Sequence, residues 1–225
     1  TLTTIVSTSR NTALGSFALE DTTGNDNTGI GHNALANLAA VSGGTAVGAG
    51  ALTTATTATN CTAVGFNALT TTNANNNTAT GYSVLSAVSS GANNCGFGAS
   101  TATALSTGSN NSYLGAAIKA PSADTNTTTV GYNSGSAFAG TTNTLIGAGV
   151  APASTAGSSN NVGVGAGALG SLDSGSTNTS IGTTSGNTIT TGTANVTIGN
   201  NAQVGAAAAT GQVVIGAGAT ATSTN

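Results

Sequence analysis

A glycine recurs every 16 to 18 residues along this chain, and this spacing restricts the possible folds more than any other property of the sequence. It appears thirteen times, and in twelve units an apolar residue precedes it. A unit this short cannot hold a pair of helices, because helical repeats need at least about 30 residues. The repeat glycines are Gly15, Gly31, Gly48, Gly65, Gly81, Gly98, Gly115, Gly131, Gly147, Gly165, Gly182, Gly199 and Gly216.

Other residue types recur at fixed distances from the repeat glycine. Asn stands four residues before it in nine units, and Thr stands three before it in eight. Ala stands three residues after it in seven units and is often followed by Leu. Thr, Val and Ile favour strands, whereas Gly, Ser and Asn are poor helix formers. Each unit therefore predicts a short strand of the form N-T-A-V, a glycine, a small A-L segment and a variable polar linker.

The repeat predicts an all-β fold, a parallel β-solenoid (β-roll) of about 13 coils of 16–18 residues. Successive coils would stack about 4.8 Å apart. The glycine would form a sharp corner where the backbone needs a positive φ and a close approach. Stacked Asn side chains would form an amide ladder. We expect an N-terminal lead-in at residues 1–10, a single repeat domain at 11–219 and a tail at 220–225, within a longer parent protein.

Side chains alternate between the two faces of a strand, so the residues one and three before the glycine share a face. The first of these positions is apolar in twelve units, which favours an inward direction for both. The late units agree with this prediction, because three of them carry Val instead of Thr three residues before the glycine: Val162, Val196 and Val213. The residue between the two positions would then face outward.

Charged residues make up only 3% of the chain, and the net charge is −3. Lys and Arg occur once each, as Lys119 and Arg10. The chain therefore lacks the basic surface that nucleic acid or anionic lipid requires. No apolar stretch reaches the roughly 18 residues of a membrane span, so we expect no membrane insertion by this segment. Disorder is an alternative for such a polar composition, but the low net charge and the regular spacing argue against it.

The interior of such a coil would be thin. The chain has no Trp or Met and only four Phe, and large side chains normally fill a core. The two ends of a solenoid are also open sheet edges, which favour association. We therefore expect several chains to pack side by side.

Three segments resemble a known family. Residues 195–199 (N-V-T-I-G) and 213–216 (V-V-I-G) resemble the core motif of trimeric autotransporter adhesin heads (YadA-like). Residues 61–69 (C-T-A-V-G-F-N-A-L) resemble repeats of bacteriophage and viral tail fibres. The resemblance covers about residues 11–219, although the repeat here is longer than the adhesin unit. It implies a β-roll packed as a homotrimer, with a host-surface protein or a glycan as partner.

His32 and the two cysteines are interpreted as structural. His32 has no acidic cluster around it in the repeat, so we expect a surface or interface side chain. Cys61 and Cys95 lie two units apart. Two coil steps of about 10 Å exceed the reach of a disulfide within one chain, while pairing between chains stays open. Cys95 occupies a position predicted to face inward and would be a small buried hydrophobe.

The five acidic residues are expected to be solvated linker residues: Glu20, Asp21, Asp26, Asp124 and Asp173. The first three share one linker, where a weak surface cation site is the alternative. No acid recurs with the repeat, as it would in a Ca²⁺-binding roll or along the groove of a polysaccharide-cleaving solenoid. The sequence also shows no nucleophile–base pair, phosphate loop or metal cluster. We predict no catalytic activity, no metal and no cofactor.

Three aromatic residues share the position directly after the repeat glycine: Phe66, Tyr82 and Tyr132. Phe66 and Tyr82 lie one coil apart, so the three form a candidate contact patch. The patch would seal a contact between subunits or stack against sugar rings. We favour the subunit contact, because a trimer needs residues that fill its interface.

The sequence favours a structural fibre segment with a surface or receptor attachment role, as in a phage or viral tail fibre or a bacterial trimeric adhesin. Such a protein would be extracellular, on a virion fibre or a bacterial surface. An architectural filament or spacer without a ligand is the alternative. An ice-binding β-solenoid ranks lower, because the threonine positions are predicted to face inward and carry Val in the late units.

Overall fold

The computed structural model describes residues 10–37, 40–135, 140–152 and 157–222. The chain divides into two compact units, Thr1–Asn111 and Ser112–Asn225. The first unit contains the three-residue strands β1 (Thr12–Leu14), β2 (Thr28–Ile30), β3 (Thr45–Val47), β4 (Thr62–Val64), β5 (Thr78–Thr80) and β6 (Cys95–Phe97). The second contains β7 (Ser112–Leu114), β8 (Thr128–Val130), β9 (Thr144–Ile146), β10 (Val162–Val164), β11 (Thr179–Ile181), β12 (Val196–Ile198) and β13 (Val213–Ile215).

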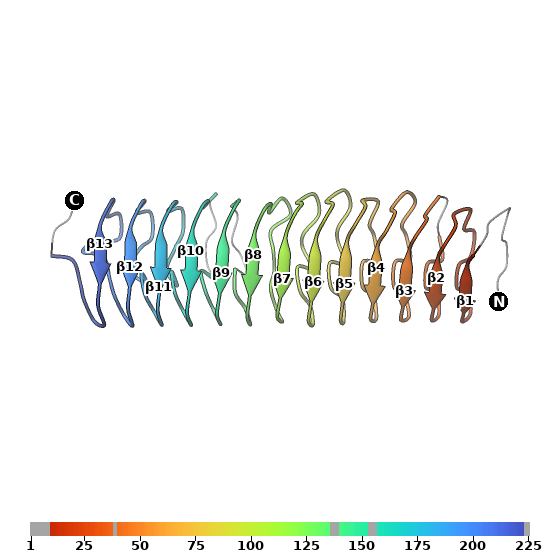
Figure 1. Cartoon of the computed structure of the whole chain (residues 1–225), viewed down its shortest axis with the longest axis horizontal. Helices are drawn as coiled ribbons and strands as arrows, with labels where there is room; N and C mark the ends of the chain where they lie inside the picture. Colours follow the sequence, from red (N-terminus) through yellow and green to blue (C-terminus); the bar gives the residue numbers. More distant parts are fainter. Residues whose placement is uncertain (1–9, 38–39, 136–139, 153–156, 223–225) are drawn as a thin grey trace. The chain divides into compact units, whose positions relative to one another are not determined.

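Within each unit the strands pair in parallel and in chain order, one strand from each coil (Figure 1). The pairing places equivalent repeat positions side by side, as in Thr45↔Thr62 and Val47↔Val64. The predicted all-β, parallel β-solenoid is therefore confirmed. No helix in the described ranges has the length and apolarity needed to cross a bilayer.

Each repeat glycine forms a corner directly after its strand. The thirteen φ angles lie between 126° and 152°, a region that side chains other than glycine rarely adopt. The next coil also lies very close. A Cβ on Gly65, for example, would lie 2.2 Å from the carbonyl oxygen of Gly81. Conformation and space thus both require glycine at this corner.

The direction predicted for the strand side chains is wrong. The central residue of the strand faces inward and is buried in twelve of the thirteen strands, while the residues on either side of it face outward. The interior is narrow at this point, because a Cβ on the central Gly163 would lie 2.6 Å from Val150 Cγ1. Small central residues fit this space, and strand alternation then turns the larger aliphatic side chains outward.

Other segments of the coil supply the bulk of the core. The Ala-Leu pair after the glycine is fully buried, as in Ala68 and Leu69. The Leu of this pair adopts a positive φ, 48° at Leu69. The linker is not purely polar, because the position seven residues after the glycine often carries a buried apolar side chain. Examples are Ala55, Val88, Leu105, Leu172 and Ile189.

The predicted amide ladder is confirmed. Asn161 Oδ1 accepts a hydrogen bond from the backbone N–H of Asn178 (2.9 Å), and its Nδ2 donates to the carbonyl of Gly175 (3.1 Å). The same arrangement links Asn178 to Asn195, whose backbone N–H donates to Asn178 Oδ1 at 3.0 Å. Each buried asparagine thus ties its own coil to the next and finds partners for its own polar atoms.

The predicted single domain over residues 11–219 stays a prediction. Most of the predicted lead-in, residues 1–9, lies outside the described residues, as do residues 223–225 of the predicted tail.

Candidate functional site

The outer face of the sheet is the candidate functional site, and two columns of side chains form it. We define the threonine column as the residues three before each repeat glycine and the apolar column as the residues one before it. Both columns follow the parallel register, so their members repeat at the strand spacing of about 4.8 Å. Within one strand the two columns are about 6.6 Å apart, twice the rise per residue.

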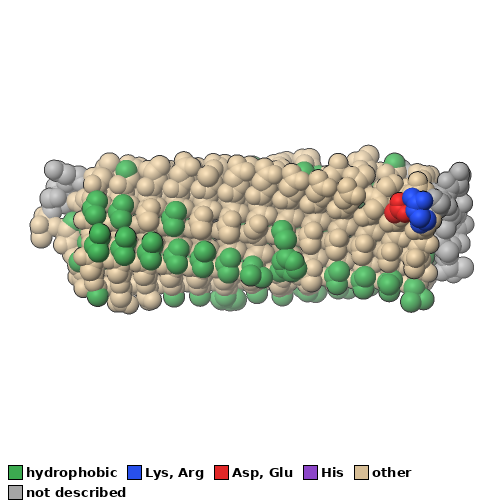
Figure 2. Space-filling view, in the orientation of Figure 1, with side chains coloured by type: hydrophobic (Ala, Val, Ile, Leu, Met, Phe, Trp, Pro, Cys, Tyr) green, Lys and Arg blue, Asp and Glu red, His purple; other side chains and the backbone are tan. Residues whose placement is uncertain are grey.

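The apolar column is exposed within each unit, where Figure 2 shows hydrophobic side chains lined up coil after coil. In the first unit Leu14 is 67% exposed and Phe97 39%. In the second unit Ile146 is 39% exposed and Ile215 66%. Single exposed apolar residues are common on protein surfaces, whereas a contiguous apolar row marks an interaction site.

The threonine column runs beside the apolar column, and its side chains are half-buried or exposed. The first unit keeps Thr in β1 to β5, and Cys95 ends the column. In the second unit Val replaces Thr in β10, β12 and β13. The face therefore presents hydroxyl and methyl groups in its first part and becomes more aliphatic in its later coils.

The aromatic residues after the glycine lie at the surface. Phe66 is 51% exposed, Tyr82 56% and Tyr132 65%. Phe66 and Tyr82 stack with their ring centroids 5.8 Å apart and an interplanar angle of 6°. Tyr132 belongs to the other unit, so the structure brings together only two of the three predicted patch residues. His32 is exposed and meets Phe17 edge to face, with centroids 5.9 Å apart.

The two cysteines are free, and their surroundings differ from those predicted. Cys95 belongs to the outer threonine column and is partly exposed, so its predicted burial is wrong. Cys61 replaces an asparagine of the amide ladder and is fully buried. Its thiol donates to the carbonyl of Ala74 at 3.3 Å, which keeps part of the asparagine's role. Burial raises the pKa of both thiols, which disfavours the reactive thiolate.

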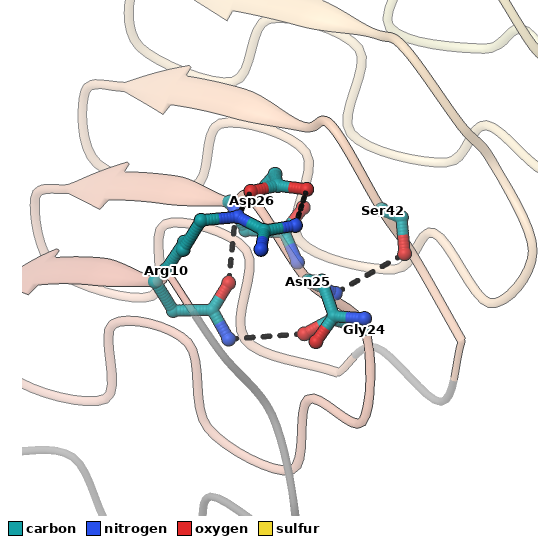
Figure 3. A network of polar contacts seen from close by, with 7 residues as sticks. Arg10, Gly24, Asn25, Asp26 and Ser42 are labelled. Carbon is teal, nitrogen blue, oxygen red and sulfur yellow. Dashed lines mark hydrogen bonds and ion pairs between the residues drawn. The ribbon is translucent and has the colours of Figure 1, made fainter.

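Asp26 forms an ion pair that the sequence reading missed. The Arg10 guanidinium binds both carboxylate oxygens of Asp26 in the next coil, with Nη2 donating to Oδ2 at 2.8 Å (Figure 3). The hydrogen bond from Arg10 lowers the pKa of the Asp26 carboxyl. Both side chains are exposed, 71% and 49%, so the pair adds little stability. The sequence could have predicted this ion pair, because Arg10 and Asp26 both stand five positions before a repeat glycine and so occupy equivalent places in successive coils.

Asp124 is buried, so its predicted place as a solvated linker acid is wrong. It is 4% exposed, and it accepts hydrogen bonds from Tyr113 Oη at 2.6 Å and Thr127 Oγ1 at 2.8 Å. Burial raises its pKa to about 6, against the effect of these hydrogen bonds. Burial also raises the pKa of Tyr113. Three residues before the ladder position, where this coil has Asp124, other coils have small residues such as Ala74 and Gly91.

The position five residues before each glycine is a second special column that sequence reasoning missed. All thirteen of its residues adopt a positive φ near 60°, including Asn60, Asn93 and Gly211. Asn, Asp and Gly tolerate this conformation best. The exposed Asn93 Nδ2 donates to Asn110 Oδ1 at 3.1 Å, which gives the surface a short amide ladder of its own. The recurrent Asn-Asn pairs of the sequence could have predicted this second column.

A scan against protein-family models and a search of curated proteins both found no match. Among the described residues no pocket opens, and no group of three His, Cys, Asp or Glu side chains is placed to hold a metal ion.

Proposed function

We propose that this chain is a segment of a structural fibre whose copies pack together through the outer face of the sheet. The exposed apolar column carries this proposal. The resemblance to adhesin heads and tail fibres supports a homotrimer with an attachment role on a virion fibre or a bacterial surface. The fibre presents a shaft to a surface or receptor outside the cell.

The energies involved favour packing over a run of coils and not at one coil. Complete burial of a Val, Leu or Ile side chain is worth about 1.5–3 kcal/mol, so covering a half-exposed one gains roughly 0.7–1.5 kcal/mol. Association itself costs about 4–15 kcal/mol. One coil cannot offset this cost, whereas a run of six or seven coils from each chain reaches the same order.

Geometry and charge support a second copy as the partner. Two copies carry the same coil spacing, so their apolar columns stay in step along the contact. No charged residue or histidine occurs between His32 and Lys119, which removes a major source of repulsion between like chains.

The mass of the chain in solution tests this proposal. We expect a trimeric mass by light scattering, and a monomeric mass for Ile146→Glu/Ile181→Glu, which places charges on the apolar column in the second unit. The matched control Ser174→Glu/Thr191→Glu adds the same charge at exposed linker positions of successive coils and is expected to stay trimeric. A monomeric native chain overturns the proposal. A trimer that binds no cells, glycans or proteins favours the architectural spacer.

Ice binding is the second candidate, and one observation favours it. The threonine column faces outward, which removes the main objection raised by the predicted inward direction. In-register hydroxyl and methyl groups on a regular parallel sheet form a periodic surface that can order water. The bulky Leu14 and Phe97 of the adjoining column and the late Val substitutions make the face less uniform.

The two candidates make opposite demands on the same face, because ice binding needs it uncovered. Thermal hysteresis by a monomeric chain, abolished by Thr62→Tyr, supports ice binding. A trimer without thermal hysteresis supports the fibre.

A further inference from the structure

The repeat pattern is broken in one stretch of the first unit, coils β4 to β6. Thr80 is the one polar residue of the apolar column, and it lies between Val64 and Phe97 in the register. The same coils carry Phe66 and Tyr82 at the position after the glycine. Departures from an otherwise regular pattern mark functional positions.

The stacked pair of Phe66 and Tyr82 leaves its two outer ring faces open. Backbone hydrogen bonds set the order of this column. Asn67 donates to the carbonyl of Ala49 (3.1 Å), and Ser100 donates to that of Tyr82 (2.8 Å). Ala49 therefore precedes Phe66 in the column, and Ala99 follows Tyr82. Methyl groups flank the rings where larger side chains would cover them.

The coils around the pair carry hydroxyl groups and no fixed charge, because no Lys, Arg, Asp or Glu occurs between Asp26 and Lys119. His32 is the ionisable residue of this column beside the pair, two coils before Phe66, since Gly50 donates to the His32 carbonyl (3.0 Å). Thr80 lies two residues before Tyr82, and the Tyr82 phenol supplies a further donor and acceptor. A ring platform with hydroxyls and without charge suits a ligand that has apolar C–H faces and neutral hydroxyls.

We propose that Phe66 and Tyr82 form a binding site for a neutral saccharide, whose ring stacks on an open face of the pair while Thr80 and the Tyr82 phenol hydrogen-bond its hydroxyls. This inference deepens the attachment role of the proposed function and rests on it. Thr80 distinguishes the site from the self-packing row, because a second copy would favour an unbroken aliphatic column at this coil. The lack of Lys and Arg in these coils disfavours anionic glycans.

Saturation-transfer NMR on the full chain tests the site with cellotetraose and chitotetraose as neutral probes and tetragalacturonate as the anionic one. We expect transfer to the ring C–H protons of a neutral probe. Phe66→Ala and Tyr82→Ala are expected to weaken its Kd about tenfold each. Both variants are expected to fold, because Ala49 and Ala99 occupy the same column.

Tyr132→Ala is the matched control, since Tyr132 has the same repeat position and no ring stacks on it among the described residues. Its binding is expected to equal that of the native chain. No transfer to either neutral probe at millimolar concentration, equal binding of tetragalacturonate, or equal binding by Phe66→Ala overturns the inference.

Light scattering on the same samples separates this inference from the proposed self-association. If Phe66→Ala lowers the mass and leaves saccharide binding unchanged, the rings form a contact between chains and the saccharide site is wrong. If a monomeric native chain binds a neutral probe through Phe66 and Tyr82, the site stands and the trimer fails.

Discussion

Leu145 and Ile146 are neighbours in β9, yet they belong to opposite faces of the sheet and to different tasks. Leu145 is fully buried, whereas Ile146 is 39% exposed. The inner positions of the strands vary widely, from Gly163 to Tyr113, because each must fit the space that the rest of its coil leaves. The outer apolar column is far more uniform. Within the strands the regular aliphatic positions are those on the surface, which points to a surface contact as the reason for their regularity.

The largest effect is expected at the corner that joins the two faces. Gly65→Ala would place a Cβ 2.2 Å from the carbonyl oxygen of Gly81, and we expect a loss of at least about 4 kcal/mol of unfolding free energy. Gly149→Ala is the control, because its φ is also positive, at 61°, but open space surrounds it. It is expected to lose only about 1 kcal/mol in urea unfolding. Equal losses would mean that conformation alone, without the close approach, requires glycine.

The next largest effect on stability is expected from the two neighbouring residues of β9. Leu145→Ala leaves a cavity in the core and is expected to cost about 2–5 kcal/mol. Ile146→Ala is expected to cost less than about 1 kcal/mol in the separated chain and to weaken association instead. Denaturant unfolding at low protein concentration measures the first effect, and light scattering the second. If Ile146→Ala costs more unfolding free energy than Leu145→Ala, the apolar column faces inward, as the sequence predicted.

The buried asparagine ladder and the exposed positive-φ column beside it give the same comparison for polar groups. Asn161→Ala leaves the buried backbone N–H of Asn178 and carbonyl of Gly175 without their side-chain partner, and we expect a loss of about 2–4 kcal/mol. Its neighbour Asn160 is exposed with a φ of 59°, so Asn160→Gly is expected to change stability by less than about 0.5 kcal/mol. Similar losses at both positions would show that the inner ladder is not special.

The smallest effect concerns the buried and the exposed aspartate. The pKa of Asp124 is about 6 in the folded protein, above its usual 3.8, so the folded state binds this proton more tightly. The free energy of unfolding is therefore expected to rise by roughly 1–3 kcal/mol as the pH falls from about 7 to about 4. Asp124→Asn removes this rise, whereas Asp26→Asn, at the surface, leaves it. A native stability that falls over this interval contradicts the assignment.

The repeat length, the strand positions and the corner glycine could all be predicted from the sequence. The thirteen glycines and the asparagines before them recur with a fixed spacing, and local chemistry explains both columns. Corners need a residue without a Cβ, and stacked amides satisfy each other between coils. These are properties of one coil repeated on the next, so periodicity is sufficient to identify them.

The candidate site could be identified only in part. The rings of Phe66 and Tyr82 were predicted one coil apart, and they do stack. The apolar column faces outward, against the prediction, because the narrow interior has room only for the central residue of the strand. The small residues at the centre of the strands, such as Ala46 and Gly163, are the better signal, since a narrow interior accepts little else.

The sequence by itself determined that this chain builds short parallel strands stacked in register, because each unit carries its own strand, corner and ladder residue. Only the tertiary structure decided which side of the strand is inside. Alternation allows both choices equally. The choice depends on how the Ala-Leu segment and the linker, as in Leu169 and Leu172, fill the coil from the opposite wall. The same packing places Asp124 inside its coil and leaves the row of aliphatic side chains outside.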